Sequence, residues 1–245
     1  MPTFFVICSN ALRLNVSSRS VHCVVTSPPY FRTRDYQLDP TWWPSDGWSG
    51  TLGNEDDPLQ YIQHLVDVCK EVKRVLRDDG VFWLNIADAY AKNDKYRKTH
   101  GIKKGELIGV PWLLALALRK DGWYLMNDNI WEKNAIPEGA KKRCLRNHEY
   151  VLQLTKSTSY FFDQIAIREP SSDPSSRGRH KRSVWNIAVG RLKFGHFSAF
   201  PPKLVEICIK ASTSEKGVCP TCGALMDRIV SRKRISTRPG KDNKE

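Results

Sequence analysis

Two short turns, Asp78-Asp79-Gly80 and Asp121-Gly122, each follow an amphipathic helix pattern and precede a buried strand pattern. Between positions 58 and 76, apolar residues recur at three- and four-residue spacing, as they do on one face of a helix. Val81–Ala87 then forms a short apolar run that is typical of a strand buried on both faces. Repeated alternation of this kind predicts an α/β fold: a doubly wound, mostly parallel sheet covered by helices.

The other elements follow from the same patterns. The first helix is expected to be capped by Asp56 or Asp57 and to end at Gly80. The Trp-, Pro- and Gly-rich stretch Pro40–Gly53 is expected to be a loop. Further strands are predicted over Phe4–Cys8, Val21–Thr26, Trp123–Trp131 and Glu149–Thr155, and further helices over Pro111–Lys120 and Pro202–Ala211.

Positive charge is concentrated in part of the chain. The net charge is +13, and the last 75 of the 245 residues hold 16 Lys and Arg against 6 Asp and Glu, whereas residues 1–91 are slightly acidic. A second basic cluster lies at 92–104, and the Ser-, Pro- and Arg-rich segment 168–182 has the composition of a mobile loop. This asymmetry favours a polyanionic partner such as nucleic acid, the alternative being a solvated, solubilising surface.

Composition also excludes some classes of protein. The chain contains no apolar run long enough to span a membrane and shows no secretory signal pattern at its start. We therefore expect no membrane partner and a cytoplasmic protein. Its seven cysteines, an odd number at irregular spacing, favour reduced thiols or a metal site over a disulfide framework.

The strand Val21–Thr26 runs directly into Ser27-Pro28-Pro29-Tyr30. In an open parallel sheet, ligands bind at the carboxyl ends of strands, so the position makes this segment a candidate site. Two prolines fix an extended backbone, and the Ser27 hydroxyl and Pro28 carbonyl can accept both hydrogens of an exocyclic base amine while Tyr30 stacks on the base. The alternative is that the prolines only end the strand and Tyr30 packs on the core.

Seven segments together resemble one family across nearly the whole chain: the amino-methylating DNA methyltransferases of restriction-modification systems, in the permuted motif order. Thr-Ser-Pro-Pro-Tyr is the form typical of enzymes acting on N4 of cytosine, and Asp-Pro-Pro-Tyr is more usual for N6 of adenine, so the resemblance favours cytosine. The segments are TSPPYF, VKRVLRDDG, VFWLNIADAY, GVPWLLALALRKDGWYLMNDNIWEK, NHEYVLQLTKS, SVWNI and GHFSAFPPKLVEICI.

The resemblance implies a Rossmann-like methyltransferase domain over residues 1–211, which binds S-adenosylmethionine and methylates a base flipped out of double-stranded DNA. It implies catalytic roles for Ser27, Pro28, Pro29 and Tyr30, and cofactor contacts from His196, Phe197, Phe200 and Pro201. The basic loops 92–104 and 168–182 supply the expected DNA contacts, namely Lys95, Arg97, Lys98, Arg177, Arg179, Lys181 and Arg182.

The chain also departs from the family pattern. We find no Gly-rich S-adenosylmethionine loop after Phe200, so we expect a chain that is incomplete at its C-terminus, inactive alone, and completed by a missing C-terminal half or second subunit. Residues 212–245 resemble the start of a cysteine-rich insertion, with Cys219 and Cys222 as a zinc half-site; a redox pair or an unligated turn is the alternative. The competing functions are N6-adenine methylation and a non-catalytic, DNA-binding fragment.

Overall fold

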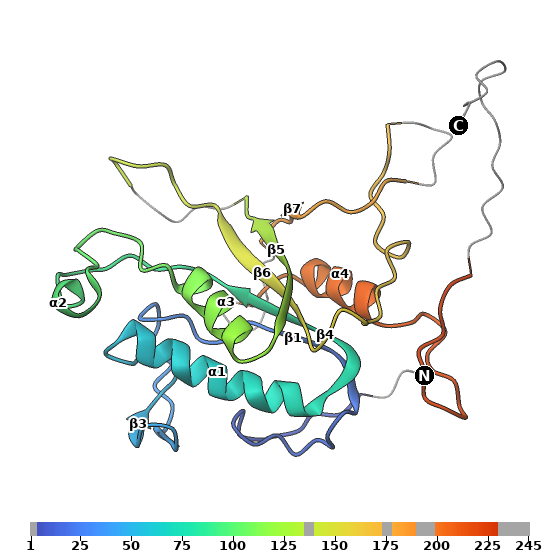
Figure 1. Cartoon of the computed structure of the whole chain (residues 1–245). Coiled ribbons are helices and arrows are strands. Elements are labelled where there is room, and N and C mark those ends of the chain that lie inside the picture. The colour runs from blue at the N-terminus through green and yellow to red at the C-terminus, as the bar shows by residue number, and fades with distance from the viewer. Residues whose placement is uncertain (1–3, 135–139, 173–177, 190–198, 230–245) are drawn as a thin grey trace, which may run out of the picture.

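A five-stranded sheet forms the centre of the computed structural model, which describes residues 4–134, 140–172, 178–189 and 199–229 (Figure 1). The strands β1 and β4 pair in parallel, as do β5 and β7, whereas β6 runs antiparallel to both of its neighbours. Four of the five strands therefore point the same way, which confirms the mostly parallel sheet. The strand order is β1 (Val21–Thr26), β4 (Leu76–Ile86), β6 (His148–Thr155), β5 (Tyr124–Glu132) and β7 (Val184–Asn186).

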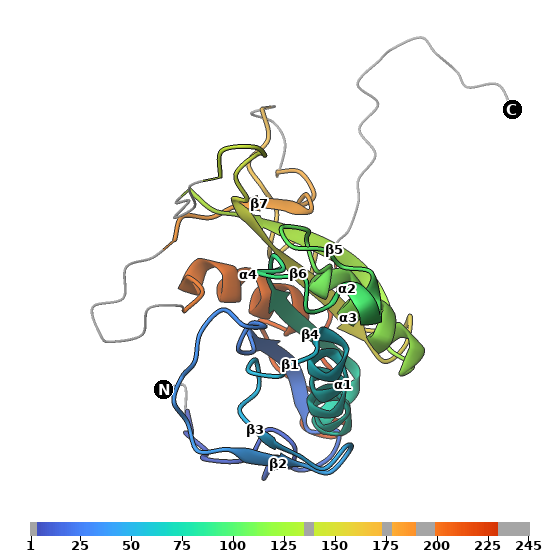
Figure 2. The same cartoon turned by 90° about the vertical axis from the view of Figure 1, so that its left-hand side faces the viewer.

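Helices cover both faces of the sheet. Helices α1 (Pro58–Val75) and α3 (Val110–Lys120) lie on one face, and α4 (Pro202–Ser212) lies on the other (Figures 1 and 2). Side chains of β4 alternate between two cores, with Phe82 and Leu84 toward α1 and α3, and Trp83 toward α4. The doubly wound arrangement is thus confirmed. Among the described residues, no helix has the length and apolar character needed to cross a membrane.

Helix α1 begins as its sequence predicts and ends earlier. The Asp57 side chain accepts hydrogen bonds from the backbone N–H groups of Leu59 (2.7 Å) and Gln60 (3.3 Å), and Pro58 occupies the first turn. The helix ends at Val75, so the Asp-Asp-Gly turn belongs to β4. A Cβ atom at Gly80 would lie 2.9 Å from the His22 carbonyl oxygen, so glycine is needed where β1 and β4 approach.

Two sequence predictions are wrong. Phe4–Cys8 is not a strand, and its apolar side chains are exposed. An apolar run forms a strand only when a neighbouring strand supplies hydrogen-bond partners, and none of the described residues pairs with this one. Pro40–Gly53 is not a simple loop, because it folds into a hairpin of β2 (Thr41–Trp43) and β3 (Trp48–Gly50). The short helix α2 (Arg97–His100) and strand β7 carry no clear periodic signal, so the sequence does not predict them.

A buried histidine joins the β2–β3 hairpin to α1. The His64 ring stacks on Trp43 and Trp48, with ring centroids 4.2 and 5.2 Å away. Its Nδ1 lies 2.9 Å from Glu55 Oε1, and its Nε2 lies 3.2 Å from Asp46 Oδ2. Since Glu55 is fully buried, its carboxylate depends on His64 and on the Gly53 backbone N–H, which donates to it at 2.7 Å.

We expect His64→Ala to lower the free energy of unfolding by about 3 kcal/mol, because it leaves the buried Glu55 carboxylate without its side-chain partner. Urea unfolding followed by tryptophan fluorescence measures the change. His100→Ala is the matched control, since His100 contacts the partly exposed Asp57 and should cost about 1 kcal/mol or less. Equal losses in the two variants would contradict a special role for the His64 cluster.

Candidate active site

The ends of four segments meet at one edge of the sheet. Ser27 to Tyr30 follow the carboxyl end of β1, and Asn85 is next to the last residue of β4. Lys133 directly follows β5. Because β6 runs in the opposite direction, its second residue, Glu149, arrives at the same edge. The antiparallel strand thus brings a carboxylate to the edge where parallel strands place ligands.

A hydrogen-bonded chain connects these residues. The Ser27 hydroxyl donates to the Tyr30 hydroxyl oxygen at 2.9 Å, and the Tyr30 hydroxyl donates to Glu149 Oε2 at 2.6 Å. Asn85 Nδ2 donates to the same Tyr30 oxygen at 2.8 Å and to Glu149 Oε2 at 2.7 Å. Lys133 Nζ lies 2.6 Å from Glu149 Oε1. We call these five residues the polar cluster.

The polar cluster lies in a region that excludes most water. Asn85 is 2% exposed and Glu149 is 7% exposed. Burial, followed by the negative charge of Glu149, raises the pKa of the Tyr30 hydroxyl well above its usual value. Tyr30 therefore stays protonated at neutral pH and serves as a hydrogen-bond donor to Glu149.

The two prolines are fixed by contacts from another part of the chain. The Tyr61 hydroxyl of α1 donates to the Pro29 carbonyl at 2.7 Å. Gly53, at φ +94°, comes so close that a Cβ atom there would lie 3.1 Å from the Tyr30 carbonyl oxygen. The extended backbone predicted for Ser27–Tyr30 is therefore held by neighbours as well as by the proline rings.

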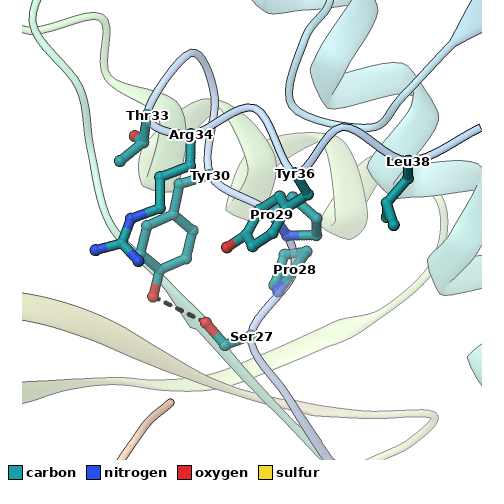
Figure 3. Close-up of a pocket in the computed structure, with 8 residues that line it drawn as sticks. All are labelled: Ser27, Pro28, Pro29, Tyr30, Thr33, Arg34, Tyr36 and Leu38. Carbon is teal, nitrogen blue, oxygen red and sulfur yellow. Dashed lines mark hydrogen bonds between the residues drawn. The ribbon is translucent and has the colours of Figure 1, made fainter. Parts of the chain in front are cut away.

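A pocket opens beside this segment. It has a volume of about 260 Å³. Figure 3 shows Ser27 at the Tyr30 hydroxyl, Arg34 extending beside the Tyr30 ring, and Tyr36 and Leu38 on the other side of that ring. Ser27 and Pro28 both line this pocket, and the role of the Pro28 carbonyl as an acceptor stays a prediction. The lining residues are Ser27, Pro28, Pro29, Tyr30, Thr33, Arg34, Tyr36 and Leu38.

A larger cavity of about 990 Å³ adjoins the pocket through Thr33 and Arg34, which line both. Asp88, whose role is not evident from the sequence, borders this cavity. Its Oδ1 accepts hydrogen bonds from the backbone N–H groups of Ala89, Gly109 and Val110, each at 2.9 Å. Asp88 therefore fastens the start of α3 to the end of β4.

Only part of the predicted cofactor segment can be placed. Phe200 is half-buried and packs against the core under α4, and Pro201 is the N-cap residue of that helix. His196 and Phe197 lie outside the described residues. None of the hydrogen bonds of the polar cluster involves Phe200 or Pro201, and their contact with a cofactor stays a prediction.

Cys219 and Cys222 lie in one tight turn. The Gly223 N–H donates to the Cys219 carbonyl at 2.9 Å, and the Cys219 N–H donates to the Ala224 carbonyl at 2.8 Å. Backbone hydrogen bonds from Cys222 and Thr221 lower the pKa of the Cys219 thiol, which favours its thiolate form. In the part of the chain that the structure describes, no group of three or more His, Cys, Asp or Glu could hold a metal ion, and the zinc half-site stays a prediction.

The predicted DNA contacts fall into two groups. Arg97 and Lys98 are exposed on α2, and Lys95 pairs with Asp56 at 2.8 Å. Three other cations share one carboxylate, Glu169; their nitrogen–oxygen distances to it are 3.3, 3.5 and 3.0 Å for Arg179, Lys181 and Arg182, respectively. Arg177 lies outside the described residues. Because three cations share one acidic partner, this second group keeps an excess of positive charge.

Sequence reasoning missed three members of the polar cluster: Asn85, Lys133 and Glu149. Signals for two of them were present. Asn85 is the lone polar residue inside the apolar run of β4, and Glu149 opens the apolar run of β6. A polar side chain at the end of a buried strand needs a partner, and the partners here come from distant parts of the chain.

Comparisons with known proteins agree on one family. The model of a family described as DNA methylase, of the N6 and N4 type, matches residues 21–219. The type II methyltransferase M.SmaI of Serratia marcescens is 41% identical over 220 residues, covering 82% of this chain and 72% of that protein. The type II methyltransferase M.XycI of Xanthomonas campestris pv. cyanopsidis is 42% identical over 214 residues, covering 80% of this chain and 67% of that protein.

A solved structure supports the fold. The structure titled PvuII DNA methyltransferase (cytosine-N4-specific) superposes with a TM-score of 0.58 at 18% sequence identity. The superposition covers 84% of this chain and 69% of the other. The Rossmann-like methyltransferase architecture predicted from the sequence is thereby confirmed.

The raised pKa of Tyr30 can be measured. The absorbance of phenolate is followed as the pH is raised, in the wild type and in Tyr30→Phe. The difference between the two curves, which reports Tyr30, should show no ionisation around pH 10, the usual range for tyrosine. Glu149→Gln should lower the pKa of Tyr30, because it removes a nearby negative charge, whereas the control Glu132→Gln should leave it unchanged. An ionisation of Tyr30 around pH 10 in the wild type would show that the phenol is not held as described.

Proposed function

The chain belongs to the N6/N4 DNA methylase family, and from this premise we propose that it transfers the methyl group of S-adenosylmethionine to the exocyclic N4 amine of a cytosine flipped out of double-stranded DNA. Two observations support cytosine over adenine. The motif has the Thr-Ser-Pro-Pro-Tyr form, and the superposed PvuII enzyme is titled cytosine-N4-specific. Methylation of adenine at N6 is the alternative that the experiment below distinguishes.

The geometry of Ser27 carries the proposal. The single hydroxyl hydrogen of Ser27 is directed to Tyr30, and the Ser27 oxygen receives only a long contact of 3.5 Å from Asn85 Nδ2, so it can accept a hydrogen bond from the pocket. Pro28 lines the same pocket, and we assign its carbonyl as the second acceptor, so that each hydrogen of a base amine has a partner. Hydrogen bonds to both amine hydrogens reduce the conjugation of the nitrogen lone pair with the ring and direct that lone pair toward the methyl donor.

Tyr30 serves two purposes in this proposal. Its hydroxyl is held by the polar cluster, while its ring lines the pocket. An aromatic ring fixed at its outer end presents a rigid face on which a flipped base can stack. Unstacking a base from the duplex costs a few kcal/mol, which stacking in the pocket offsets in part.

The described residues fit a flat, partly apolar cofactor at the start of α4. Phe200 is half-buried, and Pro201 beside it is buried at the N-cap of α4. We assign these two residues to contacts with S-adenosylmethionine. When bound, this cofactor supplies an activated methyl group on a sulfonium centre. The protein contributes orientation of the base amine and exclusion of water.

Mass spectrometry of methylated bases tests the proposal. The chain is expressed alone, and also from its complete locus with the neighbouring genes, in a host that lacks both N4-methylcytosine and N6-methyladenine. We expect N4-methylcytosine in the DNA of the host that carries the locus. N6-methyladenine instead would establish the alternative, and the absence of both bases would overturn the proposed function.

Ser27→Ala should reduce methyl transfer by about 100-fold, because it removes a hydrogen bond that orients the amine in the transition state. Single-turnover kinetics on an unmethylated duplex that contains the target sequence measure the effect. Ser49→Ala, which removes an exposed hydroxyl on β3, is the control and should keep the wild-type rate. A Ser27→Ala enzyme with near-normal turnover would remove Ser27 from the mechanism.

DNA affinity should depend on the basic residues around Glu169. Each of the variants Arg179→Gln, Lys181→Gln and Arg182→Gln removes one cation, and the log–log slope of affinity against salt concentration should decrease by about 0.9 for each phosphate that is no longer neutralised. Filter-binding titrations on duplex DNA measure the slope. Lys70→Gln on α1, which removes a cation paired with Asp67, should leave it unchanged. If the three variants also keep the wild-type slope, these side chains do not bind phosphate.

A further inference from the structure

We propose that Glu149 is the final proton acceptor of the methyl-transfer reaction, reached from the base amine through the hydroxyls of Ser27 and Tyr30. The inference rests on the proposed function and deepens it. A methylated amine carries one proton too many, so the reaction needs a group that takes it. The polar cluster supplies a continuous route from the pocket to a carboxylate.

The direction of the hydrogen bonds is set by Glu149. An ionised carboxylate can only accept, so the Tyr30 hydroxyl must donate its single hydrogen to Glu149 Oε2 at 2.6 Å. The Tyr30 oxygen is then an acceptor, and Ser27 donates its single hydrogen there at 2.9 Å. Both hydroxyls therefore point toward Glu149, and the Ser27 oxygen, which has only a long 3.5 Å contact from Asn85 Nδ2, can receive a proton from the pocket side.

Two donors lie beside the Glu149 carboxylate. Lys133 Nζ lies 2.6 Å from one carboxylate oxygen, and Asn85 Nδ2 donates to the other at 2.7 Å. The Lys133 side chain is 22% exposed, so the cluster borders water at Lys133. The other charged or titratable groups nearby are His148, the first residue of β6, Arg146 just before that strand, Tyr61 on α1, and Arg34, whose side chain lies beside Tyr30 in Figure 3.

The step balances in atoms and electrons. The N4 lone pair forms the new N–C bond, and the bond between the methyl carbon and sulfur breaks with its electron pair left on sulfur. One N–H proton then moves to the Ser27 oxygen, the Ser27 proton to the Tyr30 oxygen, and the Tyr30 proton to Glu149 Oε2. The products are a neutral methylamino group and a protonated Glu149, which returns its proton to water. Both hydroxyls end protonated, with their hydrogens on the pocket side, and they turn back toward Glu149 before the next turnover.

Tyr30 passes the proton without ionising. Burial and the charge of Glu149 hold its pKa well above the usual value, so the phenolate is disfavoured. A concerted shift in which Tyr30 gains one proton as it loses another avoids that state. This requirement makes the short contact between Tyr30 and Glu149 a functional feature as well as a structural one.

The test measures single-turnover methyl transfer across a range of pH, with enzyme purified after expression of the complete locus. We expect Glu149→Gln to slow the step by about 100-fold, a typical contribution from a positioned acid or base. The wild-type rate should fall at acid pH as Glu149 becomes protonated, and this fall should be absent in Glu149→Gln. DNA affinity should change by less than about threefold.

Glu132→Gln is the matched control. Glu132 lies at the end of β5 beside His148 and contacts Asn147 and Asn186, outside the polar cluster. It should keep both the wild-type rate and the acid limb of the pH profile. Circular dichroism and thermal melting verify that each variant is folded.

Tyr30→Phe gives an independent variant that breaks the same route while keeping the ring. It should also lose the acid limb, and the double variant Tyr30→Phe/Glu149→Gln should be no slower than the slower single variant, because both interrupt one path. If Glu149→Gln does not fold, Tyr30→Phe alone decides: a retained acid limb overturns the inference. If the wild type is active and Glu149→Gln is as fast, the proton route is rejected and the proposed function stands. If the wild type methylates no base, the proposed function itself is rejected.

Discussion

The antiparallel strand β6 between β4 and β5 is the constraint on which the candidate site depends. A wholly parallel sheet would put only carboxyl ends at the edge where ligands bind. Reversing one central strand adds its first residues, and so Glu149 meets Ser27, Tyr30 and Asn85 there. Burying a carboxylate at this depth costs free energy unless it is fully hydrogen-bonded. The contacts from Tyr30, Asn85 and Lys133 meet that requirement.

The same constraint explains why the motif needs its surroundings. Ser27-Pro28-Pro29-Tyr30 is stiff along its backbone, yet stiffness does not fix the direction of a hydroxyl hydrogen. That direction comes from Glu149, more than a hundred residues further along the chain. The Tyr61 contact with Pro29 and the close approach of Gly53 hold the backbone from the other side. Local rigidity and distant partners are therefore both needed to produce one oriented acceptor.

The sequence predicts the elements with strong periodicity and the motif at the end of β1. Helices α1, α3 and α4 and strands β1, β4, β5 and β6 lie close to their predicted ranges, because amphipathic spacing and buried apolar runs are local signals. Phe4–Cys8 shows the limit of such signals, since its apolar run lacks a partner among the described residues. The polar cluster lay beyond local patterns because it joins residues from four segments, and only the strand order and direction bring them together.

Asp88 joins the two ends of the loop between β4 and α3. One carboxylate oxygen binds the backbone at both ends of this excursion, Ala89 on one side and Gly109 and Val110 on the other, and the Ile108 N–H donates to the Ala89 carbonyl at 2.9 Å. These hydrogen bonds close the base of the segment between Ala89 and Gly109, which carries the basic helix α2. Farther along, Lys95 pairs with Asp56 and His100 with Asp57, so the segment is fixed to the start of α1 as well as at its base, and the strand end that carries Asn85 stays in register.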